Sequence, residues 1–246
     1  MCLIVYKPKG IEMPSKQELE KCFKHNPDGA GYMLPLNDKV IIRKGFMTFD
    51  DFKKDINNIV KQNNIDVLNT PIVLHFRITT QGGVQQALCH PYPICRSYDE
   101  MRALASESDI ARAHNGIISL TSESNRYSYW NRTTKKWEYN EKQLDYNDTM
   151  TFIKDYASLI IDNDLYFAIN SSKCELLERL IGASKLAIMN RKGFVKLIGQ
   201  FIERNGVFYS NTNHLIDPKT YYGFKTTKNY TFEELGLYDN DDDYTI

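Results

Sequence analysis

The chain has 246 residues, of which 42% are hydrophobic, so it can bury a sizeable core and fits one domain of ordinary size. Its 31 basic and 31 acidic residues balance, which argues against nucleic-acid binding driven by bulk charge, although not against a local basic patch. The five cysteines are odd in number and irregularly spaced, which is typical of reduced thiols. No stretch approaches the ~18 apolar residues of a membrane span, and we expect a cytosolic protein without membrane partners.

The second residue, Cys2, precedes the apolar run of a predicted strand at residues 2–7. Removal of Met1 would leave a thiol and a free α-amino group on the same residue. An α-amine, with a reference pKa of about 7.7 to 8.0, can accept the proton of a thiol whose pKa is about 8.5. The position is therefore a candidate for a nucleophile that carries its own base, although a Cys that merely fills a strand has the same sequence context.

Two further strands are predicted at residues 30–36 and 39–44, joined by a turn at Asn37-Asp38. Residues 49–62 then predict an amphipathic helix, with Phe52 and Ile56 on its apolar face and Thr48 or Asp50 as its N-cap.

A strand predicted at residues 71–79 carries Arg77 towards its end, after the apolar run Ile72-Val73-Leu74. A planar guanidinium binds a carboxylate through two parallel hydrogen bonds, which fixes the orientation of the bound group in a way that a lysine does not. Arg77 is therefore a candidate clamp for a substrate carboxylate.

The next predicted strand, at residues 110–118, contains His114-Asn115-Gly116. An amide side chain beside a glycine N–H offers two donors to one oxygen atom. Attack of a thiolate on an amide develops negative charge on that oxygen, and each aimed donor contributes about 3 to 4 kcal/mol of transition-state stabilisation. Asn115 and Gly116 are therefore a candidate oxyanion hole.

The second half of the chain is expected to begin with a hairpin inserted at about residues 119–146. A helical stretch follows Asn147-Asp148-Thr149, and another is predicted at residues 174–181. Four short strands at residues 185–190, 194–199, 201–204 and 207–210 are predicted to form a meander, because turn residues separate them. The final residues lack periodicity, and we treat residues 214–246 as a partly flexible C-terminal extension.

Taken together, these segments resemble the class II glutamine amidotransferase domain, a branch of the N-terminal-nucleophile hydrolases, over roughly residues 2–213. The resemblance lies in the order and spacing of short motifs. They are the Met-Cys start, residues 26–31 (Asn-Pro-Asp-Gly-Ala-Gly), residues 75–82 (His-x-Arg-x-x-Thr-x-Gly), His90-Pro91, residues 114–116 and residues 147–149. The resemblance implies an α+β fold in which two antiparallel sheets are flanked by helices, as a four-layered αββα sandwich.

The resemblance also implies the site residues. Cys2 would be the nucleophile, its α-amine the base, and Asn115 and Gly116 the oxyanion donors. Arg77 would bind the α-carboxylate of glutamine and Asp148 its α-ammonium group. The family motifs assign Thr80 and His90 to substrate binding as well.

Three departures from the family pattern accompany the match. An arginine often precedes the Gly-x-Asp segment, whereas this chain has Asn26-Pro27-Asp28 there, and Ile78 stands where an aromatic residue commonly follows the arginine. The interval from Asn115 to Asp148 is also long, so that Asp145 and Asp162 remain alternatives to Asp148.

The implied activity is glutamine hydrolysis by a stand-alone domain, with ammonia delivered to a small molecule or to a partner synthase acting in trans. Two alternatives remain: an N-terminal-nucleophile amidase that cleaves another linear amide, and a non-catalytic scaffold with the same fold. We expect neither a cofactor nor a metal. Cys89, His90 and Cys95 contain no short Cys-x-x-Cys pair, and the family motif already accounts for His90. The acceptor of the nitrogen and the oligomeric state do not follow from the sequence.

Overall fold

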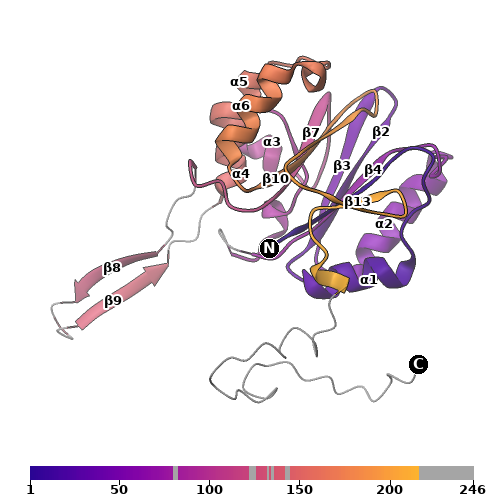
Figure 1. The fold of residues 1–246 in the computed structure, drawn as a ribbon. Coiled ribbons are helices and arrows are strands. Elements are labelled where there is room, and N and C mark those ends of the chain that lie inside the picture. The colour runs from indigo at the N-terminus through magenta and orange to yellow at the C-terminus, as the bar shows by residue number, and fades with distance from the viewer. Residues whose placement is uncertain (80–82, 122–125, 132, 134–135, 142–144, 216–246) are drawn as a thin grey trace, which may run out of the picture. The chain divides into compact units, whose positions relative to one another are not determined.

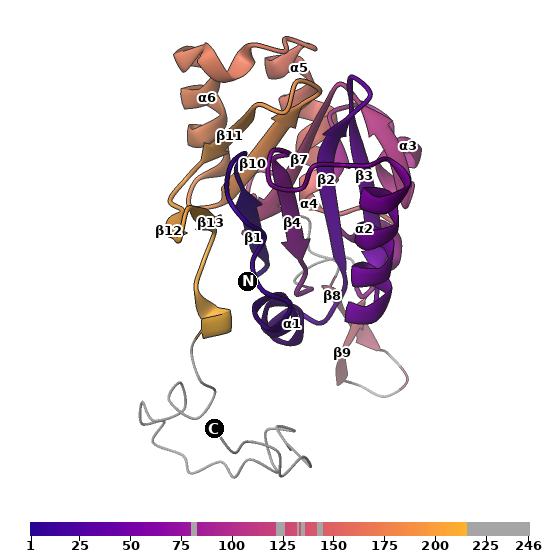
Figure 2. The same ribbon diagram turned by 90° about the vertical axis from the view of Figure 1, so that its right-hand side faces the viewer.

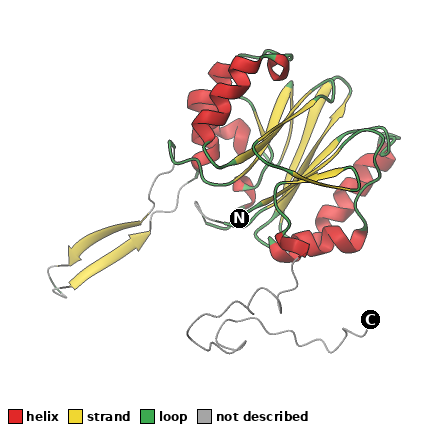
Figure 3. Ribbon diagram, viewed as in Figure 1, coloured by secondary structure: helices red, strands yellow, loops and turns green. Residues whose placement is uncertain are grey.

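The computed structural model describes residues 1–79, 83–121, 126–131, 133, 136–141 and 145–215 (Figure 1). The chain divides into two compact units, Met1–Thr212 and Asn213–Ile246. The second unit opens with a short 3-10 turn, η4 (Asn213–Leu215), and the remainder of the expected C-terminal extension lies outside the described residues. The first unit carries the helices and sheets considered below (Figure 3).

The largest sheet of the first unit is antiparallel and has seven strands. Its strands, in spatial order, are β12 (Ile202–Arg204), β13 (Val207–Tyr209), β1 (Leu3–Lys7), β4 (Ile72–Phe76), β2 (Ala30–Leu36), β3 (Lys39–Phe46) and β6 (Ala105–Ser108). The N-terminal strand β1 lies between β13 and β4, with Val5 paired to both Tyr209 and Leu74. Residue 2 therefore lies beside the C-terminal end of β4.

A four-stranded antiparallel sheet has the order β11 (Val195–Ile198), β10 (Lys185–Asn190), β7 (Ile110–Asn115) and β5 (Tyr92–Pro93). Its central strand β7 is fully buried and pairs with β10 so that Asn115 lies opposite Lys185. The predicted hairpin forms a separate two-stranded sheet of β8 (Arg126–Asn131) and β9 (Lys136–Glu141), in which Trp130 pairs with Trp137.

The helices divide between the two sheets (Figure 2). On the seven-stranded sheet lie α1 (Lys16–His25) and α2 (Phe49–Gln62), and on the four-stranded sheet lie α3 (Tyr98–Arg102), α4 (Asp148–Phe152), α5 (Ser158–Ile161) and α6 (Ser171–Ile181). A π-helical turn, η2 (Ile153–Ala157), joins α4 to α5, and two 3-10 turns are η1 (Gln86–Leu88) and η3 (Phe167–Ile169).

The helix predicted at residues 49–62 is found with those bounds. The N-cap and the apolar face that predicted it are both present. Thr48 Oγ1 accepts a hydrogen bond from Asp51 N, and Phe52, Ile56 and Ile59 are buried. Phe52 packs among aromatic side chains that cover the sheet, which we call the aromatic core: Phe23, Tyr32, Phe46, Phe49, Phe52 and Phe76.

Side chains from the two large sheets also share one apolar cluster. Ile4, Met33 and Val73 of the seven-stranded sheet pack with Ala111 and Ala113 of β7 and with residues of β10. On β7 these two alanines alternate with Arg112 and His114, as expected when successive side chains point to opposite faces of a strand. The small side chains thus face the other sheet, while the large polar ones lie on the side of α4.

The structure confirms an α+β fold of two antiparallel sheets with helices, and it corrects one part of the predicted topology. The last four strands do not form one meander, because β11 pairs with β10 in the four-stranded sheet whereas β12 and β13 join the seven-stranded sheet. The turn at Asn205-Gly206 correctly predicted the β12–β13 hairpin, in which both residues have positive φ. Turn residues define a hairpin but do not determine which sheet it joins.

Candidate active site

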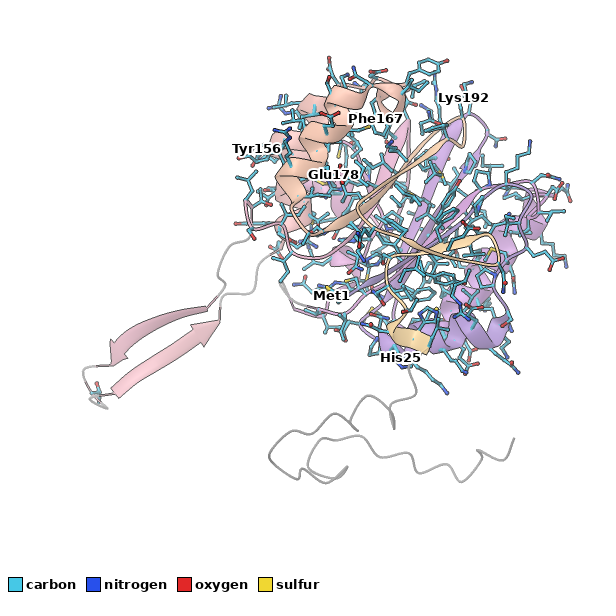
Figure 4. All side chains as sticks on the ribbon, in the orientation of Figure 1. Met1, His25, Tyr156, Phe167, Glu178 and Lys192 are labelled. Atoms are coloured by element: carbon cyan, nitrogen blue, oxygen red, sulfur yellow. The ribbon has the colours of Figure 1, made fainter. Side chains whose placement is uncertain are left out.

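Cys2 lies directly before β1 and is partly buried. Its thiol donates a hydrogen bond to the carbonyl oxygen of Ile78 over 3.4 Å, and its own carbonyl accepts one from Asn211 Nδ2 at 2.8 Å. Residues far apart in the sequence therefore hold both ends of Cys2. Met1, labelled in Figure 4, still precedes it and has 67% of its surface exposed.

The environment of the Cys2 thiol keeps it protonated. Burial raises the pKa of the thiol above its ordinary value, and the positive charges of Arg77 and of the chain's N-terminus oppose this rise only in part. The carboxylate of Asp148 raises the pKa further. A thiol in this setting needs a base beside it before it can attack a carbonyl.

Arg77 lies directly after β4 and is almost fully buried. Its backbone is tied to the motif at residues 26–31, since Arg77 N donates to Gly29 O at 2.8 Å and Asp28 N donates to Arg77 O at 3.0 Å. The guanidinium donates through Nη2 to Gly83 O at 2.9 Å. Asp28 also accepts from Thr79 N at 2.7 Å, which orders the chain after β4, whereas Thr80 lies outside the described residues.

Asn115 ends β7, and Gly116 follows it in a conformation that excludes other residues. Gly116 has a φ of +139°, and a Cβ built on it would lie 2.3 Å from the Oγ of Ser184. Asn115 is 3% exposed, and its Nδ2 lies 2.8 Å from the Oγ of Ser210. Its Oδ1 has no hydrogen-bond partner among the described residues.

Asp148 is the first residue of α4 and is 8% exposed. Asn147 caps the helix by accepting from Met150 N at 2.9 Å, as the motif predicts. The carboxylate of Asp148 accepts from Ile118 N through Oδ2 at 2.7 Å and from Thr149 N through Oδ1 at 2.8 Å. These bonds tie Asp148 to the segment that follows Asn115 and Gly116.

Opposing effects act on the charge of the Asp148 side chain. Burial raises the pKa of this carboxyl group, while the two backbone N–H groups and the charge of Arg112 lower it.

The alternatives, Asp145 and Asp162, lie in different settings. Asp145 pairs with Arg102 at 3.3 Å with 79% of its side chain exposed, and Asp162 is an exposed residue that ends α5 with positive φ. Of the three carboxylates, Asp148 alone is buried.

His90 belongs to a buried group of three histidines. Its Nδ1 lies 3.1 Å from His75 Nε2 and 3.0 Å from the carbonyl oxygen of His114, and the peptide bond to Pro91 is cis. Burial lowers the pKa of all three, that of His75 to about 3, so the group is neutral near pH 7. His114 Nδ1 lies 2.7 Å from Thr149 Oγ1, and the group thereby reaches the residue beside Asp148.

Arg112 is a buried cation that no sequence motif indicated. It is fully buried on β7, and its three guanidinium nitrogens have no hydrogen-bond partner among the described residues. Its Cζ lies 4.9 Å from the centre of the Phe152 ring. Burial lowers the pKa of the Arg112 side chain to about 9, and the charge of Asp148 raises it. Arg112 thus supplies positive charge to the helix that begins at Asp148.

Ser210 and Asn211 were also missed, because neither residue belongs to a recognisable motif. They follow β13, and they contact Cys2, Ile4 and Asn115 from the opposite end of the sequence. Only their long-range partners indicate a role.

Two hollows elsewhere in the first unit contain none of these residues. A polar hollow of about 340 Å³ is lined by residues including Lys39, Cys95 and Asp109, and an apolar one of about 220 Å³ lies between α1 and α2.

Within the described part of the chain, no group of three histidine, cysteine or acidic side chains is arranged to hold a metal. No described helix has the length and apolar character needed to span a bilayer.

No protein-family model matches this chain, and a comparison with curated proteins found no match either. The motifs and their positions in the fold therefore carry the functional interpretation by themselves.

Proposed function

We propose that this protein is a glutamine-hydrolysing enzyme of the class II amidotransferase type, with Cys2 as its nucleophile. The observation that carries the proposal is the convergence of four motifs from separate parts of the sequence. The charges of Arg77 and Asp148 both act on the Cys2 thiol. Asn115 is linked to β1 through Ser210, whose hydroxyl also accepts from Ile4 N at 2.8 Å.

The proposed site binds both charged ends of an amino acid. Arg77 takes the α-carboxylate of glutamine, for which a guanidinium is the best-matched side chain, and Asp148 takes the α-ammonium group. Held at both ends, the side-chain amide of glutamine lies within about 3 to 3.5 Å of the Cys2 sulfur. Burial of Arg77 and Asp148 strengthens both ion pairs, because little water competes for the charges.

The reaction proceeds in two steps. The sulfur of Cys2 bonds to the amide carbon while the α-amine accepts the thiol proton, and negative charge develops on the amide oxygen. Asn115 and Gly116 N–H donate to that oxygen. The α-amine returns the proton to the departing nitrogen, which leaves as ammonia, and the resulting thioester is then hydrolysed by water to give glutamate and the free thiol.

This mechanism requires removal of Met1, because the Cys2 nitrogen is otherwise part of a peptide bond and cannot act as a base. The 67% exposure of Met1 fits access by an aminopeptidase. Intact mass of protein made without an N-terminal tag measures this directly. Full activity in a sample that retains Met1 would exclude the α-amine mechanism.

The proposed function extends to the fold and to the fate of ammonia. We assign the two sheets and their helices to the four-layered αββα sandwich of N-terminal-nucleophile hydrolases. The apolar cluster that both sheets share and the helices on each sheet support this assignment. Ammonia passes to a small-molecule acceptor or to a partner synthase in trans, and nothing in the described residues selects between them.

A glutamine-like electrophile tests the site. It should label Cys2 alone among the five cysteines, and Cys2→Ala should abolish both labelling and ammonia release while thermal unfolding is unchanged. Cys95→Ala is the matched control, because Cys95 is also a partly buried free thiol and its sulfur contacts Ser97 O. Cys95→Ala should leave both the labelling of Cys2 and the release of ammonia unchanged.

The outcomes separate three functional classes. Slow ammonia release that rises severalfold on addition of a small-molecule pool supports an acceptor-coupled amidotransferase, and fast release without that response supports a simple amidase. A folded protein without Met1 that neither reacts at Cys2 nor binds glutamine would be a scaffold, and the proposal would be wrong.

A further inference from the structure

Ser210 connects the strand of the proposed nucleophile to the proposed oxyanion donor. It is fully buried directly after β13, and its backbone N–H donates to Ile4 O at 2.9 Å. Its hydroxyl oxygen accepts from Ile4 N at 2.8 Å and lies 2.8 Å from the side-chain amide of Asn115. The separations in sequence are 206 and 95 residues, so three distant segments meet at one hydroxyl group.

The hydrogen-bond capacity of these groups favours one orientation of the Asn115 amide. A serine hydroxyl has one proton to donate and can accept two hydrogen bonds. With Asn115 Nδ2 facing Ser210, the serine oxygen accepts from both Ile4 N and Asn115 Nδ2. Asn115 Oδ1 is then left buried without a partner among the described residues. Among the described residues this orientation leaves two polar groups unsatisfied, Asn115 Oδ1 and the serine proton, whereas the exchanged orientation leaves only the Asn115 NH₂ group.

The exchanged orientation uses the serine proton. The oxygen and nitrogen ends of a side-chain amide have nearly the same shape, so the hydrogen-bond network determines which end faces which neighbour. With Oδ1 towards Ser210, the hydroxyl accepts from Ile4 N and donates to Asn115. The NH₂ group of Asn115 then occupies the position that has no protein partner.

We propose that Ser210 is a positioning residue that donates its hydroxyl proton to Asn115 Oδ1 and thereby presents the Asn115 NH₂ group to the oxyanion. The inference rests on the proposed function, because a buried NH₂ group without a protein acceptor is useful only if a substrate oxygen supplies one. Pre-aligned donors are effective because they need no reorganisation when the charge develops. Ser210 thus acts through Asn115 and does not contact the substrate.

Neighbouring contacts fix the serine itself. Lys185, which lies opposite Asn115 in the register of β10 and β7, donates through Nζ to the carbonyl oxygen of Ser210. The next residue, Asn211, donates to the carbonyl of Cys2 at 2.8 Å. The same two-residue segment therefore fixes the nucleophile and the oxyanion donor relative to each other.

Neutron diffraction from crystals of the deuterated wild-type protein tests the orientation without any assay of activity. The deuteron on Ser210 Oγ should point to Asn115 Oδ1, and the two deuterons on Asn115 should point away from Ser210. A deuteron of Asn115 located between Nδ2 and Ser210 Oγ would overturn the proposal. This result does not depend on whether glutamine is the substrate.

Kinetics of ammonia release test the consequence. Ser210→Ala should lower kcat by about 100-fold, as expected for loss of one aligned oxyanion donor, with KM for glutamine changed less than threefold. Ser210→Thr retains the hydroxyl and should keep most of kcat. Ser108→Ala is the control, because Ser108 ends β6 and its hydroxyl makes a local contact to Ile110 O, at the opposite end of β7 from Asn115. This variant should leave both constants unchanged.

The double variant Asn115→Ala/Ser210→Ala separates positioning from general support of the strand. Once Asn115 is absent, loss of the Ser210 hydroxyl should lower kcat by less than twofold. Additive losses in the double variant, or a wild-type kcat in Ser210→Ala, would contradict the positioning role. Absence of ammonia release from the wild type would contradict the proposed function, and neutron diffraction would still decide the orientation of the amide.

Discussion

The aromatic core on the seven-stranded sheet and the polar cluster at the strand ends are both buried, but they satisfy their polar groups differently. In and beside the aromatic core, the hydroxyl groups of Tyr32 and Tyr209 reach Asp55 and Glu18 at 2.6 and 2.7 Å. The polar cluster consists of His75, His90, Arg112, His114, Asn115 and Asp148. Several of its nitrogen and oxygen atoms have no hydrogen-bond partner among the described residues.

This difference separates stabilisation of the fold from the proposed chemistry. Burial of aromatic rings contributes favourable free energy without conflicting demands. Buried polar atoms without partners each cost about 1–3 kcal/mol, and such costs concentrate at sites where a ligand supplies the missing partner. We therefore expect changes in the aromatic core to affect stability alone, and changes in the polar cluster to affect glutamine kinetics or the pH dependence of stability.

Acidification should give the largest effect, because it acts on the histidines of the polar cluster. Burial lowers the pKa of His75 to about 3 and those of His90 and His114 below their usual value, so these groups bind protons mainly after unfolding. Their contribution to stability is complete above about pH 6.5 and is lost as the pH falls towards the folded pKa. At pH 5 the loss is about 2 kcal/mol for His75, and His90 and His114 add losses in the same direction.

Urea unfolding at pH 7 and pH 5 measures this loss, in a range where ordinary carboxylates remain ionised. His75→Gln should reduce this loss by about 2 kcal/mol, since it removes one histidine that is neutral in the folded protein. His25→Gln is the control, because His25 ends α1 outside the cluster, and its pH dependence should match the wild type. A total loss below about 2 kcal/mol would show that the cluster is not neutral in the folded protein.

Phe52→Ala should lower the free energy of unfolding by about 4 kcal/mol, because it removes a buried ring from the aromatic core. Phe52 is 1% exposed and packs against Tyr32, Phe46, Phe49 and Phe76. At 20 °C, where enough of the variant remains folded, kcat and KM per folded molecule should equal those of the wild type. A changed KM would mean that the two regions are coupled.

Asp148→Asn should raise KM for glutamine about 10- to 100-fold, because it removes one charge that binds the substrate and retains the shape of the side chain. Asp145→Asn tests the alternative carboxylate three residues earlier, which is exposed and paired with Arg102. Steady-state ammonia release should show no change for Asp145→Asn. A larger effect of Asp145→Asn than of Asp148→Asn would reverse the assignment.

Arg112→Met should give the smallest effect, a shift in the pH dependence of glutamine binding. Without Arg112 the pKa of Asp148 rises further, so binding should be lost on acidification at a higher pH than in the wild type. Isothermal titration between pH 5 and 8 measures the shift. Arg102→Met, which removes a partly exposed cation, should leave the profile unchanged, and an equal shift in both variants would exclude a specific effect of Arg112.

Much of the fold could be predicted because its signals are local. Helix α2 has an N-cap and an apolar face within fourteen residues, and these determine both its ends and its buried side. Helix α1 was not predicted, because most of its ten residues are polar and only Cys22 and Phe23 are buried. The division of the last four strands between two sheets depends on pairing with β1 and β7, and no local signal encodes it.

The proposed site was predictable to the extent that it follows motifs. Cys2, Arg77, Asn115, Gly116 and Asp148 each stand in a short pattern with a chemical rationale. Ser210, Asn211 and Arg112 have none, because their importance comes from partners far away in the sequence or from burial without a hydrogen-bond partner among the described residues. Such residues are found only when the chain is folded.

The pairing of β1 with β13 has a consequence for synthesis of the protein. Of the described strands, β1 is synthesised first, yet one of its two neighbours in the sheet ends at Tyr209. The hydroxyl that links Ile4 to Asn115 belongs to the following residue, Ser210. The proposed nucleophile is therefore synthesised long before Asn211, and the proposed site is complete only once Asn211 has been added.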